Sequence, residues 1–204
     1  LIYTWLSSLR WTLYNYTVVS EINYKALPKP TKLLWVDLEM TGLDVSRDRI
    51  LEIACEVTDF DFKTLASYEA VVRQPDAVLD NMNDWSKKQH KISGLTDRIK
   101  KDGRPEKEVI HEVVGFIKAQ FGSSPAILAG NSIHNDRNFI KQWWPEVESL
   151  LHYRMCDVSS LKIIMNTKYG AEFKKKEVHR AFDDIQASIA ELQYYLDYLK
   201  NEDA

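Results

Sequence analysis

The chain has 204 residues, a length typical of one domain with its own hydrophobic core. Apolar residues make up 45% and charged residues 28%, which is typical of a soluble globular protein. The net charge of −3, from 30 acids and 27 bases, argues against a protein that grips long nucleic acid through many phosphates. A short nucleic acid held by a few contacts stays compatible with this charge. No run of about 18 apolar residues occurs, so we expect no membrane-spanning helix.

Residues 1–30 differ from the rest of the chain. They are rich in aromatic and β-branched residues, carry few charges and end at Pro28 and Pro30, a boundary signal. We expect an N-terminal extension over 1–30 and a compact domain over 31–204. The extension has three interpretations: an arm packed on the domain, the remnant of an organellar leader, or an expression artefact. A leader is acid-poor, and residues 1–20 hold no acid, but they hold only one Arg.

The first half of the domain is predicted to contain three strands and then two helices. Strands are expected over 33–40, 49–59 and 65–74, where β-branched and apolar residues are concentrated. A helix is predicted over 78–91, with Trp85 on its apolar face. A second is predicted over 106–121, where Val109, Val113, Phe116 and Ile117 repeat at helical spacing.

The second half alternates between strand and helix. A short buried strand is expected within "PAILAGNS" (125–132), followed by a helix over "HNDRNFIKQWW" that Pro145 closes. Further helices are predicted over 157–168 and 180–199. Three early strands followed by alternating helices and strands predict an α/β fold with a mixed sheet. Cys55 and Cys156 lie in apolar contexts without zinc-site spacing, which indicates two buried thiols in a reducing compartment.

Two acids follow the first apolar run, in "LLWVDLEM". Asp37 and Glu39 are two residues apart on a strand, so their side chains share one face. Like charges this close raise each other's proton affinity unless a cation neutralises them, and Mg²⁺ prefers carboxylate oxygens. The alternative is a strand end that enters a polar loop, with both acids solvated.

Later acids bear on this choice. Asp136 follows a short apolar strand, and "EVHRAFDDIQ" supplies His179, Asp183 and Asp184 just before or within the last predicted helix. Each acid could simply favour a helix N-terminus, and we interpret Asp157 as a helix N-cap. Together, however, the acids and the His suit phosphodiester cleavage. Two cations roughly 4 Å apart can clamp the phosphate, and a nearby His can accept the proton of the attacking water.

At these residues the chain resembles the DEDDh class of 3′→5′ exonucleases, and most closely the oligoribonucleases. The resemblance covers about residues 31–199 and rests on "WVDLEMTGLD", "RILEIACEVTD", "MNDWSKKQHKISGLT", "LAGNSIHNDRNF", "HYRMCDVSSLK" and "HRAFDDIQASIAELQYY". The segments "RQPDAVLDNMNDW" and "AGNSIH" look more like the eukaryotic branch. The resemblance implies a ribonuclease-H-like mixed sheet flanked by helices. It also implies an exoribonuclease that degrades very short RNAs, mainly dinucleotides, to 5′-mononucleotides.

The resemblance also implies residue roles. Two divalent cations, Mg²⁺ or Mn²⁺, would be held by the four acids Asp37, Glu39, Asp136 and Asp184, with His179 as the general base. It thus selects Asp184 over Asp183. The substrate would be contacted by Leu43, Trp85, His90, Ser132, Tyr153, Arg154 and Ser159. The family forms homodimers, in which Tyr153 would reach across from the partner, and Trp143 and Trp144 would supply either the interface or the core.

Two other functions stay open at this point. One is a general exonuclease of the same class that acts on longer RNA or DNA, against which the missing basic track argues. The other is a non-catalytic nucleotide-binding dimer, against which the complete set of acids and His179 argues. We expect an intracellular protein, mitochondrial, cytoplasmic or both, and not a secreted one.

Overall fold

The computed structural model describes residues 29–174 and 180–202. The chain clusters into two compact units, Leu1–Pro30 and Thr31–Ala204, and all the elements given below lie in the second unit. The expectation for residues 1–30 therefore falls, apart from Lys29 and Pro30, outside the described residues. So does His179.

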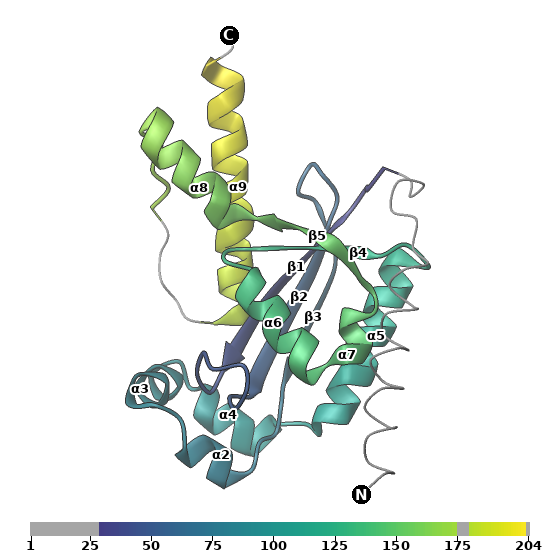
Figure 1. Ribbon diagram of the computed structural model, residues 1–204, viewed down its shortest axis with the longest axis vertical. Helices are drawn as coiled ribbons and strands as arrows, with labels where there is room; N and C mark the ends of the chain where they lie inside the picture. Colours follow the sequence, from purple (N-terminus) through teal and green to yellow (C-terminus); the bar gives the residue numbers. More distant parts are fainter. Residues whose placement is uncertain (1–28, 175–179, 203–204) are drawn as a thin grey trace, which may run out of the picture. The chain divides into compact units, whose positions relative to one another are not determined.

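A mixed sheet forms the centre of this unit (Figure 1). Its described strands follow the order β3-β2-β1-β4-β5. β1 pairs antiparallel with β2 and parallel with β4, and β5 continues the parallel part at the edge. Their bounds are β1 Leu33–Met40, β2 Ile50–Thr58, β3 Thr64–Val71, β4 Ala126–Gly130 and β5 Leu151–Asp157.

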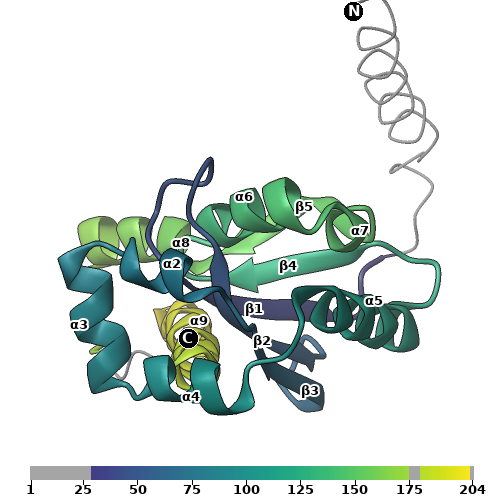
Figure 2. The same cartoon turned by 90° about the horizontal axis from the view of Figure 1, so that it is seen from below.

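Helices cover both faces of the sheet, with α5 and α9 on opposite sides (Figures 1 and 2). α2, α3 and α4 gather near the end of the sheet at which β1 stops. The helical bounds are α2 Asp76–Asp80, α3 Asp84–Ile92, α4 Leu95–Asp102, α5 Glu106–Phe121, α6 His134–Trp143, α7 Pro145–Glu148, α8 Val158–Ile164, the π-helical turn Met165–Tyr169, and α9 Ala181–Glu202. Within the described part of the chain, no helix has the length and apolar composition needed to cross a membrane.

The alternation of side chains along β1 decides which face carries chemistry. Leu34, Val36 and Leu38 pack on the face covered by α5, α6 and α7. Leu33 and Trp35 pack on the opposite face, against the apolar residues of α8 and α9. Since side chains two apart on a strand share a face, Asp37 and Glu39 continue the Leu33–Trp35 row toward α9. The α/β fold with a mixed sheet is confirmed.

One sequence prediction needs correction, and two elements were not predicted. The expected helix 78–91 is two helices, because the side chain of Asn83 accepts a hydrogen bond from the Ser86 N–H and caps a new helix. The strand β5 and the helix α4 are the two elements that the sequence patterns do not predict. The predicted helix 157–168 continues as α8 and then as the π-helical turn, and the Asp157 side chain caps it as predicted, accepting from the Ser159 N–H.

The two neighbouring tryptophans have different environments. Trp144 is fully buried in the core, and its indole N–H donates to Glu106 at 3.0 Å. Trp143 is half-buried and stacks under the guanidinium of Arg49, 3.4 Å from the ring centre. An interface role for Trp144 is therefore wrong, because its side chain already lies inside the domain.

Candidate active site

Three carboxylates from two elements meet beside the end of β1. One oxygen each of Asp37, Glu39 and Asp184 lies within 4.8 Å of the other two, and all three side chains are half-buried. β1 supplies the first two, and the first turn of α9 supplies Asp184. α9 is held there because Ile185 and its apolar neighbours pack on the same sheet face as Trp35. Oxygen ligands at this spacing suit a hard divalent cation.

Asp136 approaches the same place from the other side of β1. It lies in the first turn of α6 and is buried, and its Oδ1 accepts a hydrogen bond from the Leu38 N–H at 3.0 Å. Asp136 does not belong to the group of three acids within 4.8 Å, but its charge acts on Glu39. The structure thus brings all four predicted metal-binding acids to the end of β1.

The electrostatics of this cluster favour protonation when no cation is bound. Burial, the largest cause, and the nearby charges of Glu52, Asp184 and Asp136 together raise the pKa of Glu39 to about 8. Burial also raises the pKa of Asp136 to about 7, although the hydrogen bond from Leu38 opposes the rise. Raised pKa values show that the ionised forms of these carboxylates lack a neighbouring positive charge. A divalent cation bound between them would supply that charge. The donor set and its charge therefore fit a metal site.

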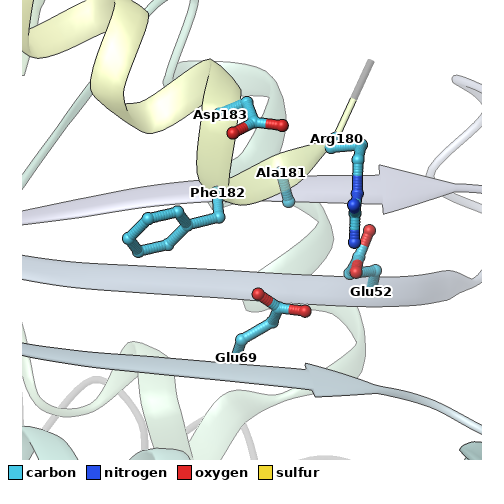
Figure 3. A pocket seen from close by; sticks show the side chains of 6 residues that line it. All are labelled: Glu52, Glu69, Arg180, Ala181, Phe182 and Asp183. Carbon is cyan, nitrogen blue, oxygen red and sulfur yellow. The ribbon is translucent and has the colours of Figure 1, made fainter. Parts of the chain in front are cut away.

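Asp183 and Asp184 are neighbours in sequence with different surroundings. Asp184 joins the carboxylate cluster, whereas Asp183 is exposed and lines a separate hollow of about 230 Å³. Figure 3 shows Arg180 at the start of α9 extending toward Glu52 on β2, with Glu69 on the next strand. The helical turn thus directs the two adjacent acids to different places.

Glu52 and Arg98 are residues near the site that sequence reasoning missed. Glu52 is buried and directly opposite Glu39 in the β1–β2 register. Arg98 from α4 donates to Glu52 and to Glu69, each at 2.6 Å. Burial raises the pKa of Glu52, and Arg98 opposes that rise. A charged residue inside the buried "LEIACEV" run was the available signal, because a buried acid requires a partner.

Ser132 and Ser159 meet at the carboxyl ends of β4 and β5. The Ser132 N–H donates to Asp157 Oδ1 at 3.0 Å and to Ser159 Oγ at 2.9 Å, and the two serine hydroxyl oxygens are 3.2 Å apart. Ser132 has a φ of 50°, in the left-handed region, so these bonds hold a turn that few side chains favour. Asn131, which was not predicted, accepts the Ser159 hydroxyl at 3.0 Å.

His90 lies beside the carboxylates rather than on the surface. It is buried, and its Nε2 donates to the Met40 carbonyl at 2.8 Å, while Nδ1 lies 3.9 Å from Glu39 Oε2. Burial lowers the pKa of His90, and the bond to Met40 opposes this change. The neutral imidazole therefore ties α3 to the end of β1.

The other predicted substrate residues are exposed. Leu43 is 78% exposed in the loop after β1, and Trp85 is 64% exposed on α3. On β5, Tyr153 is 48% exposed, and the Arg154 guanidinium lies 5.1 Å from the centre of its ring. Leu43, Trp85, Tyr153 and Arg154 thus lie on the surface of the domain.

The sequence matches known proteins across this region. A family model described as Exonuclease matches residues 34–192. The mitochondrial oligoribonuclease of Homo sapiens is 42% identical over 169 residues, which cover 80% of this chain and 71% of that protein. An oligoribonuclease of Francisella tularensis subsp. tularensis (strain WY96-3418) is 44% identical, with coverage of 80% and 93%.

Solved structures with this fold are more distant in sequence. An exonuclease I from Methylocaldum szegediense superimposes with a TM-score of 0.59 at 19% identity, over 82% of this chain and 40% of that one. E. coli exonuclease I in complex with a dT13 oligonucleotide gives 0.60 at 15% identity, over 83% and 43%. The chain thus spans less than half the length of these exonuclease I chains, and they support the fold alone. The family match and the close relatives show that the chain belongs to the oligoribonuclease family of exonucleases and is a nuclease.

Proposed function

We propose that the protein is a metal-dependent 3′→5′ exoribonuclease that degrades very short RNAs, chiefly dinucleotides, to 5′-mononucleotides. The observation that carries this proposal is the meeting of Asp37, Glu39 and Asp184 within 4.8 Å, in a chain 42–44% identical to oligoribonucleases. The modest net charge of −3 agrees with a substrate that has few phosphates.

Asp37, Glu39, Asp136 and Asp184 would hold the divalent cations, two ions of Mg²⁺ or Mn²⁺. Bound there, such cations supply positive charge to the scissile phosphate and acidify the attacking water. The protein's own contribution is rigidity. The buried strand β1 holds Asp37 and Glu39, and the bond from Leu38 holds Asp136. We assign the general base to His179, which the sequence places five residues before Asp184 and which lies outside the described residues.

The end of the RNA would be recognised by polar groups at the ends of β4 and β5. Ser132 and Ser159 offer hydroxyls, and Arg154 offers a guanidinium suited to phosphate oxygens. Leu43 and Trp85, both exposed, would contact the bases, since bases stack on aromatic and apolar faces. We assign His90 to the same end pocket, in which it would act through its contact with the Met40 carbonyl.

We propose a homodimer, with Tyr153 reaching the partner's substrate. The edge position of β5 and the exposure of Tyr153 support this proposal. We also propose that residues 31–204 form the exonuclease domain and that residues 1–30 are an extension of it. A mitochondrial location is supported by the mitochondrial oligoribonucleases among the relatives.

The deciding experiment measures hydrolysis of 5′-labelled RNAs of two to ten nucleotides, with Mn²⁺ and then with EDTA. The proposal predicts metal-dependent cleavage that is fastest on the dinucleotide. Equal or faster cleavage of the longer RNAs would instead indicate an extended binding track, as in a general exonuclease. If the protein binds nucleotide but cleaves none of the RNAs, it is instead a non-catalytic nucleotide-binding protein.

A further inference from the structure

The strand β2 meets α9 through two acidic side chains. Glu52 and Glu56 are four residues apart on β2 and lie directly opposite Glu39 and Trp35 of β1, so they share the sheet face on which α9 packs. Both are buried. The Glu56 carboxylate accepts a hydrogen bond from the side-chain amide of Gln186. Glu56 therefore ties the second turn of α9 to β2.

Glu52 faces the residue at which α9 begins. Arg180 directly precedes this helix, and its side chain extends toward the Glu52 carboxylate across the hollow that both residues line (Figure 3). Burial raises the pKa of Glu52, and the positive charges of Arg98 and Arg180 oppose that rise. The charge of Arg180 thus acts on a carboxylate that the rigid sheet holds in place.

The backbone of Arg180 is bonded to a predicted metal ligand. The Arg180 carbonyl accepts the Asp184 N–H at 2.9 Å, and this bond closes the first turn of α9. The first turn of a helix has few bonds of its own, so contacts from outside the helix decide where it lies. The Asp184 carboxylate must lie within 4.8 Å of Asp37 and Glu39 to complete the cluster. A displacement of Arg180 would therefore displace Asp184.

We propose that Arg180 is a positioning residue, anchored by Glu52, that fixes the first turn of α9 and thereby holds the Asp184 carboxylate where a divalent cation binds. Arg180 acts through Asp184 and not by contact with the cation. This inference rests on the proposed function, because the cation belongs to that function.

The test uses the sign of a change in Mn²⁺ affinity, measured without RNA from the EPR signal of free Mn²⁺. A positive charge that acts only through its field repels a divalent cation, so its removal would lower the Kd. Removal of a positioning residue raises the Kd instead. Arg180→Met should raise the Kd for Mn²⁺ about tenfold, the factor for a group that orients a metal ligand. Arg180→Lys should restore most of the affinity, because it keeps the charge that pairs with Glu52.

A double-mutant cycle tests the anchor. Glu52→Gln should also raise the Kd for Mn²⁺, and adding Arg180→Met to it should raise the Kd no further. Gln186→Met is the matched control, because it removes the other tether between β2 and α9 and leaves Arg180 in place. It should lower the melting temperature and keep the wild-type Kd.

Several results would overturn the inference: a wild-type or lower Kd in Arg180→Met, a further rise in the double variant, or an equal rise in Gln186→Met. Arg180 is exposed, so its replacement should leave the fold intact. If Arg180→Met nevertheless does not fold, Glu52→Gln serves instead, and a wild-type Kd there would overturn the inference as well. A wild type that binds Mn²⁺ but cleaves no dinucleotide would count against the proposed function alone.

Discussion

The Asp136 carboxylate accepts a hydrogen bond from the Leu38 N–H, 3.0 Å away, although the two residues are 98 positions apart in the chain. Leu38 lies between Asp37 and Glu39, so this bond joins the start of α6 to the part of β1 that carries two acids. A backbone donor cannot change rotamer, and it therefore fixes the Asp136 oxygen relative to the cluster. The first two predictions below depend on this arrangement of acids.

Replacing Asp37 by Asn should abolish turnover while the fold is kept. The substitution preserves shape, removes one ligand charge and relieves repulsion among the three clustered carboxylates. We expect a fall in kcat of at least about a hundredfold, with a melting temperature no lower than that of the wild type in EDTA. Asp183→Asn is the matched control, since Asp183 is exposed and outside the cluster. Wild-type turnover in Asp37→Asn would contradict the metal-site assignment.

Stability of the metal-free protein should fall as pH rises. The folded-state pKa values of Glu39, about 8, and Asp136, about 7, lie above those of the unfolded chain, so the folded state binds more protons between about pH 4.5 and 8. Melting temperatures in EDTA should therefore decrease across this window, and Mg²⁺ should raise them most at the alkaline end.

Glu39→Gln provides the control for that pH dependence. It cannot ionise, so its melting temperature in EDTA should depend less on pH than that of the wild type. An EDTA profile that is flat or rises with pH in the wild type would contradict the raised pKa values.

Arg98→Met should destabilise the domain by about 2–3 kcal/mol, because it leaves the buried Glu52 without its partner next to Glu39. Urea denaturation would measure this change in the free energy of unfolding. Adding Glu52→Gln should recover part of the loss. Lys200→Met, which breaks a pair exposed on both sides, should cost less than about 0.5 kcal/mol. Similar losses in the two single variants would show that burial of Glu52 is unimportant.

Two tryptophans should respond oppositely to truncation. Trp144→Ala should lower the free energy of unfolding by about 3–5 kcal/mol, because it empties a fully buried site. Trp85→Ala should leave stability nearly unchanged and raise KM for a dinucleotide by about tenfold, the factor for one lost base stack. Chemical denaturation and steady-state kinetics would separate these outcomes. An unchanged KM in Trp85→Ala would exclude its role at the bases.

Local patterns were sufficient where neighbours in sequence decide the structure. β1, β2 and α5 follow their expected ranges, because β1 and β2 are short, largely apolar runs that the sheet buries on both faces, and the buried residues of α5 repeat at helical spacing. Asp157 was predicted as a cap from its type and position alone. The boundary inside 78–91 was missed because a single capping bond at Asn83 outweighs a continuous apolar pattern.

The sequence by itself determined the fold class, the pairing of Asp37 with Glu39 on one strand face, and the family. The family resemblance selected Asp184 over Asp183, and the tertiary structure gives the physical reason, because the direction of a helical side chain depends on how α9 packs on the sheet. The tertiary structure alone decided that Trp144 is core and that β5 completes the sheet. In each case the partners are distant in sequence, and only packing shows which of them share a buried environment.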